Sequence, residues 1–261
     1  MQLEEVKIKL DELLKPNLAY DWDNVGLTVG EKSQQIQKVL LTLEINDSVI
    51  NEAIENKVDL IISHHPLIFK PIKSITNMDK KGSMLFKLIK NSISVYIAHT
   101  NFDILNGGLN DYISNLLLLK NIEKLAFENS DLEAMGRYGE LETAMDIEDF
   151  ISYVKIKLGL KHIRLVDGVK SQIKKIGIVA GSGMEYVNYA YELACDAYLT
   201  GDVKYHDAQD WLNKKMHILD IGHYGSEIHF KSNMLEILNK ELSGKIDFII
   251  SDALKDPFRT V

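Results

Sequence analysis

The pattern that most constrains the fold of this chain is a strand–helix–strand unit that occurs twice. Residues 38–63 contain two apolar segments, each of strand length, separated by a segment with helical spacing of apolar residues. Shifted by 137 positions, residues 38–65 align without a gap with residues 175–202. Two parallel strands joined by a helix require a right-handed crossover. The sequence therefore predicts an α/β protein in which one half of the structure is repeated.

The repeat continues with a second shift, of 124 positions. The predicted strands at 94–98 and 217–222 each lead directly to a histidine, His99 in the first copy and His223 in the second. An acidic residue follows four positions later in both copies, Asp103 and Glu227. These acids are candidate ligands, although an acid at such a position can also cap a helix or lie in solvent.

We predict two interlinked α/β domains. Residues 1–125 together with 218–261 are expected to form the first domain, and residues 126–217 the second. The last predicted strand, 246–250, is expected to return to the first domain. Further predictions are a helix capped by Asp47 or Ser48, helices at 185–195 and 226–242, and a loop at 127–130.

Two adjacent histidines, His64 and His65, follow the buried strand at 59–63. Within a strand, neighbouring side chains point to opposite faces, but at a strand exit the backbone can turn both rings toward one cleft. Pro66 favours an extended conformation for the residue before it, which fits such an exit. Ligand clefts in α/β sheets lie at the carboxyl ends of strands. We therefore expect a metal cleft, placed at the domain interface.

The candidate ligands are imidazoles and carboxylates without thiolates, a set that suits zinc, manganese or iron. Five or six such groups are more than one tetrahedral ion requires and fit two divalent ions with room for water. His99 is open to two interpretations, direct ligation or support of a neighbouring ligand. The loop at 19–27, which holds two aromatic and three short polar side chains, either lines a pocket or serves as a lid or packing plug. Gly181-Ser182-Gly183 either offers backbone N–H groups to a phosphate or forms a tight turn.

Composition limits the class of protein. The formal net charge of −8 argues against nucleic-acid binding. No apolar run reaches the roughly 18 residues that a membrane helix requires, so no membrane contact is expected. The single cysteine, Cys195, cannot form an internal disulfide and indicates a reducing, cytoplasmic location.

Five motifs occur along the chain in a fixed order: Trp22-Asp23-Asn24-Val25-Gly26-Leu27, Ser63-His64-His65-Pro66, His99-Thr100-Asn101-Phe102-Asp103, Thr200-Gly201-Asp202 and Gly222-His223-Tyr224-Gly225-Ser226-Glu227. Together they resemble the motifs of the dinuclear-metal-centre hexameric proteins, also called GTP cyclohydrolase I type 2 homologs or Nif-three-like proteins. The resemblance implies a homohexameric ring with two metal ions in each subunit.

By motif position, the resemblance implies that His64 and Asp103 hold one ion, that His65 and His223 hold the other, and that Glu227 bridges both. Glu227 and His99 are the candidate catalytic residues for proton transfer. Some members of the family are described as opening the guanine ring of GTP by hydrolysis, which implies a metal-dependent hydrolase with a nucleotide-like or other small-molecule substrate. The alternative is a metal-binding, metal-delivering or ring-shaped scaffold protein without turnover, because fold and metal do not by themselves fix a reaction.

Overall fold

The computed structural model describes residues 1–126 and 135–259. The chain forms two compact units, Met1–Leu105 with Phe230–Val261, and Asn106–His229. Each unit is built on one mixed β-sheet, so the predicted α/β class is confirmed. The predicted loop at 127–130 lies outside the described residues.

The first unit contains a five-stranded sheet in the order β1-β4-β3-β2-β11. Strand β1 is antiparallel to β4, and the other neighbours are parallel. The strands are β1 (Gly26–Val29), β2 (Lys38–Thr42), β3 (Leu60–Ser63), β4 (Ser94–Ile97) and β11 (Asp247–Ile250). Because β11 pairs with β2, the prediction that the last strand returns to the first domain is confirmed.

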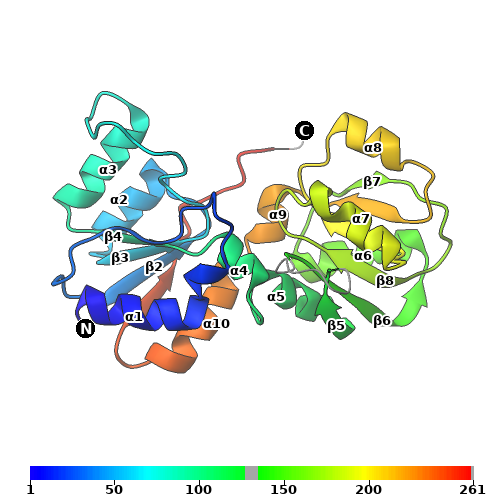
Figure 1. Ribbon diagram of the computed structural model, residues 1–261, viewed down its shortest axis with the longest axis horizontal. Coiled ribbons are helices and arrows are strands. Elements are labelled where there is room, and N and C mark those ends of the chain that lie inside the picture. Colours follow the sequence, from blue (N-terminus) through cyan, green and yellow to red (C-terminus); the bar gives the residue numbers. More distant parts are fainter. Residues whose placement is uncertain (127–134, 260–261) are drawn as a thin grey trace. The chain divides into compact units, whose positions relative to one another are not determined.

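Helices cover both faces of this sheet, which is why β3 and β4 consist of fully buried residues. Figure 1 shows α2 and α3 on one face and α1 and α10 on the other. Helix α1 buries the stripe Leu3, Val6, Leu10 and Leu14 against the sheet. The helices are α1 (Leu3–Leu14), η1 (Pro16–Leu18), α2 (Asp47–Glu55), α3 (Lys80–Lys90), α4 (Thr100–Ile104) and α10 (Phe230–Leu242).

The second unit contains a six-stranded sheet in the order β5-β6-β8-β9-β10-β7, with β8, β9 and β10 parallel. Its strands are β5 (Lys120–Lys124), β6 (Arg137–Met145), β7 (Arg164–Val166), β8 (Ile173–Ile178), β9 (Ala197–Thr200) and β10 (His217–Asp220). Its helices are α5 (Leu109–Leu116), α6 (Ile147–Leu158), η2 (Met184–Tyr186), α7 (Val187–Glu192), α8 (Tyr205–Trp211) and α9 (His223–Glu227).

The structure confirms the internal repeat. Strands β2, β3 and β4 lie in the same order as β8, β9 and β10, and the third strand of each set pairs with an antiparallel strand. The equivalence extends to one hydrogen-bonded carboxylate. Asp59 accepts the backbone N–H groups of residues 37 and 38, and Asp196 accepts those of residues 174 and 175, which are the same positions after the shift.

Three predicted details differ from the structure. Asn46, rather than Asp47 or Ser48, caps α2, because its side chain accepts the N–H of Val49. The helix predicted at 185–195 is the short pair η2 and α7, and the helix predicted at 226–242 is divided into α9 and α10. That division coincides with the boundary at which the chain passes from the second unit to the first.

The unit boundaries also differ from the predicted 125/126 and 217/218. Strand β5 pairs with β6, and β10 pairs with β9, so both strands belong to the sheet of the second unit. The motif at 222–227 consequently lies in the second unit. Within the described ranges, every helix is too short or too polar to cross a lipid bilayer.

Candidate metal centre

Three histidines gather at the carboxyl ends of neighbouring strands in the first unit. His64 and His65 follow β3, and His99 follows β4, which pairs with β3 in parallel. One ring nitrogen from each histidine lies within 4.8 Å of those of the other two. The ring centroids are 5.3 Å apart for His64 and His65, and 5.1 Å and 5.7 Å from each of these to His99. We call these residues the triple-histidine group.

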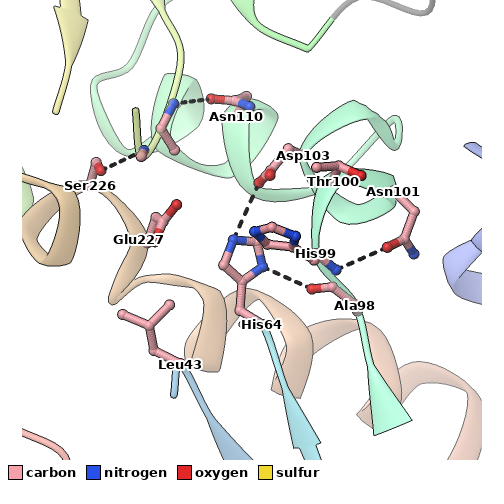
Figure 2. Close-up of polar contacts among 12 residues, drawn as sticks. Leu43, His64, Ala98, His99, Thr100, Asn101, Asp103, Asn110, Ser226 and Glu227 are labelled. Carbon is pink, nitrogen blue, oxygen red and sulfur yellow. Dashed lines mark hydrogen bonds and ion pairs between the residues drawn. The ribbon is translucent and has the colours of Figure 1, made fainter. Parts of the chain in front are cut away.

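His64 is fully buried, and both of its nitrogens have defined neighbours. Figure 2 shows Nδ1 directed at the carbonyl of Ala98, 2.8 Å away, and Nε2 directed at Asp103. A carbonyl oxygen only accepts hydrogen bonds, so Nδ1 carries the proton and Nε2 presents its lone pair. Nε2 lies 3.7 Å from Asp103 Oδ1. Two ligands of one zinc ion are separated by a similar distance, roughly 3.5 Å.

Carboxylates orient the other two rings of the group. Nδ1 of His65 lies 2.9 Å from Glu44, and Nδ1 of His99 lies 3.0 Å from Asp23. Burial by itself would raise the pKa of Asp23, but hydrogen bonds and positive charge from His99, with hydrogen bonds from Thr100, outweigh it and lower that pKa. Asp23 is therefore a carboxylate at neutral pH, and it fixes the ring of His99.

The second unit contains a separate group of candidate ligands, His223 and Glu227, which lie one helical turn apart on α9. His223 Nε2 is 2.9 Å from Glu227 Oε2. On the other side of the ring, Nδ1 lies 2.7 Å from Asp202, which follows β9. We call His223 and Glu227 the His–Glu pair. Its two ligand atoms lie within hydrogen-bond distance, somewhat closer than the roughly 3.5 Å that separates two ligands of one zinc ion.

Because Gly181 has no side chain, the carboxylate of Glu227 can occupy the space beside its Cα atom. A Cβ atom at position 181 would lie 2.3 Å from Glu227 Oε1, and the backbone there has φ +65°. The N–H of Gly181 bonds to Ser226, and the N–H of Gly183 bonds to Thr200. Because these donors are used within the protein, the tight-turn interpretation of the glycine segment agrees with the structure.

These residues fit divalent metal ions. In all four histidines an oxygen lies within hydrogen-bond distance of Nδ1. Nε2 of His64 is directed toward Asp103, and Nε2 of His223 toward Glu227. Histidines that bind metals characteristically donate their second N–H to a carboxylate or carbonyl, which fixes the ring and raises its basicity. With the carboxylates of Asp103 and Glu227, the donors are nitrogen and oxygen, which suit zinc, manganese or iron.

The sequence did not identify the carboxylates that hold these rings. Glu44 was not singled out, and Asp23 and Asp202 entered only as members of motifs that carry the resemblance, without a role of their own. One signal was available, since Glu44 and Asp202 follow β2 and β9 at the carboxyl ends of parallel strands. The position of Asp202 in the repeat, equivalent to His65, is a second signal.

Comparisons with known proteins match one family over nearly the whole chain. The family model for Duf34/NIF3 (NGG1p interacting factor 3) matches residues 1–257. A Clostridium perfringens protein named GTP cyclohydrolase 1 type 2 homolog is 37% identical over 262 residues, with both chains fully covered.

Two solved structures are similar over the full chain. A Bacillus cereus protein related to NIF3 has a TM-score of 0.90 at 25% identity, covering 100% of this chain and 99% of that one. A hypothetical protein of Staphylococcus aureus has a TM-score of 0.88 at 30% identity, with the same coverage.

Proposed function

This chain belongs to the Duf34/NIF3 family, and from that membership we propose that it is a metal-dependent hydrolase acting on a nucleotide-like substrate. The observation that carries the proposal is that four histidine rings each have an oxygen acceptor within hydrogen-bond distance of Nδ1. The four residues are His64, His65, His99 and His223. Such rings are prepared to bind cations through Nε2. The homologues' name supports a purine nucleotide, GTP, as the first substrate to examine.

We propose that the two ligand groups serve one dinuclear centre. His64 and Asp103 would hold one divalent ion, His65 and His223 the second, and Glu227 would bridge them, as the resemblance of the motifs implies. Zinc, manganese and iron all match the donors. When bound, such ions would supply a water that ionises near neutral pH, which is the chemistry that hydrolysis requires.

His99 and Glu227 would move protons. The ring of His99 is fixed at Nδ1 by Asp23, so Nε2 is the atom that can accept a proton. Glu227 is almost fully buried, and a carboxylate oxygen of Glu227 that no ion engages would be the atom that accepts a proton.

The experiment is an assay of metal-loaded protein against GTP and a panel of other nucleotides, with the metal content measured on the same sample. We expect about two ions per chain and turnover that His65→Ala and Glu227→Ala both abolish. His162→Ala is the matched control, because position 162 is exposed and lies outside both ligand groups. Bound metal without turnover on any nucleotide would instead support a metal-binding or metal-delivering protein.

We also propose that the chain assembles as a homohexamer, on the resemblance of the motifs alone. Light scattering on the eluting protein gives the mass in solution, and a mass of six chains is expected. The single, buried cysteine supports a reducing, cytoplasmic location. Fractionation of cells with an antibody against the protein tests that location.

A further inference from the structure

An exposed aromatic cluster lies beside the triple-histidine group in the first unit. It consists of Tyr20, Trp22 and Phe69, which we call the aromatic platform. The ring centroids of Trp22 lie 5.8 Å from those of both Tyr20 and Phe69. Trp22 is 57% exposed and Phe69 is 49% exposed, so two large rings present their surfaces to solvent. Burial of large aromatic side chains usually stabilises a folded protein, so two such rings that are exposed side by side indicate a surface that binds a ligand.

The backbone on both sides of Trp22 is held in place. Tyr20 donates its N–H to the hydroxyl of Thr100, and Asp23 accepts both the N–H and the hydroxyl of the same threonine. On the Phe69 side, the amide of Asn24 donates to the carbonyl of Ile68 at 2.6 Å. The platform is therefore preorganised, which reduces the entropy lost when a ligand binds.

The platform is connected to the candidate metal ligands. The ring of Trp22 meets the ring of His99 edge-on, with centroids 6.3 Å apart. The next residue, Asp23, holds Nδ1 of the same histidine. A flat ring stacked on Trp22 would thus lie beside His99, at a distance from which another part of the same molecule can reach the triple-histidine group.

We propose that the aromatic platform binds the planar nitrogen heterocycle of the substrate, a ring of nucleobase size, by stacking on Trp22. The inference rests on the proposed hydrolase function and adds the part of the substrate that the protein recognises. Stacking suits any nucleobase, because every base has a π-face. Lys70 and Lys73 follow Phe69 on the same exposed loop and add positive charge that favours a phosphorylated ligand.

The two tryptophans of the chain allow a direct measurement. Trp211 is buried, whereas Trp22 is exposed. The substitution Trp211→Phe leaves Trp22 as the single tryptophan, so the indole fluorescence then reports on Trp22 alone. In this variant, loaded with metal, GTP is expected to quench the fluorescence of Trp22, whereas inorganic triphosphate, which has no ring, is not. N-acetyltryptophanamide in the same titration corrects for absorption by the nucleotide.

Calorimetry on the otherwise unchanged protein gives the size of the effect. Trp22→Ala is expected to weaken GTP binding roughly 5- to 150-fold, the range measured for loss of one base–aromatic stack. Binding of inorganic triphosphate should stay unchanged, and Trp22→Phe should restore part of the GTP affinity. If Trp22→Ala does not fold, Phe69→Ala, on a separate loop, is expected to reduce GTP affinity in the same selective manner.

Three outcomes would overturn the inference. The first is that GTP and inorganic triphosphate bind equally well, and the second is that Trp22→Ala weakens the binding of both ligands alike. The third is that Trp22→Ala changes the mass in solution without changing GTP affinity, which would assign the platform to contact between copies of the chain. Ring-dependent binding without turnover would support the platform and contradict the hydrolase proposal, so the two failures are distinguishable.

Discussion

Substituting Gly181 by alanine tests whether Glu227 is a metal ligand. The new Cβ would lie 2.3 Å from Glu227 Oε1, whereas real Cβ atoms essentially never approach closer than 3.0 Å. The carboxylate oxygen must therefore move by at least about 0.7 Å, more than the roughly 0.2 Å by which metal–ligand distances vary. We expect metal affinity to fall at least about tenfold, the lower end of the loss seen when support of a metal ligand is removed.

The matched control is Gly159→Ala. Gly159 has φ +67°, nearly the value at Gly181, and a Cβ there would meet nothing within 4 Å. Both variants are expected to lose about 1–2 kcal/mol of stability, because alanine disfavours the left-handed conformation. Urea denaturation measures that loss, and calorimetry with zinc or manganese measures affinity. The reasoning is refuted if Gly181→Ala and Gly159→Ala bind metal with equal affinity.

Three further predictions follow from the described contacts. Asp202→Asn removes the charge that holds His223 and should weaken metal binding about 10- to 100-fold, as measured by calorimetry. Asp59→Ala and Asp196→Ala each leave two backbone N–H groups without their acceptor and should each cost about 2–4 kcal/mol in urea denaturation. Burial raises the pKa of the Cys195 thiol to about 12, so iodoacetamide should label Cys195 only after unfolding. Because the folded pKa exceeds the ordinary value of 9.0, the stability contributed by the neutral thiol should decrease as pH rises from about 9 to about 12, and Cys195→Ala should remove that dependence.

Each of these predictions can be contradicted by a particular result. Unchanged metal affinity in Asp202→Asn would show that the carboxylate does not orient the ring. A large loss in Asp59→Ala with none in Asp196→Ala would show that the repeated carboxylates are not equivalent in energy. Rapid labelling of Cys195 in the native protein would mean that the thiol is accessible, contrary to its 3% exposure.

The sequence was sufficient to predict the repeated half of the structure and the positions at which its central strands end. Continuous apolar segments such as 60–62 identify strands covered on both faces, because a parallel sheet with helices on both faces buries every residue of its central strands. The gapless alignment of 38–65 with 175–202 predicted both the topology and the equivalence of Asp59 and Asp196. Helix ends were less well predicted, as at Asn46, because several neighbouring residues there can serve as caps.

The partners of the histidines could not be predicted in the same way. His65 and Glu44 meet because β2 and β3 are neighbours, and His99 and Asp23 meet because the loop before β1 bonds to the start of α4. The sequence therefore determined which residue types stand at the strand ends and so the chemistry available to the protein. Only the tertiary structure decided which oxygen holds each ring and which nitrogen is presented, because a hydrogen bond of about 3 Å depends on the neighbours that folding brings together and not on spacing along the chain.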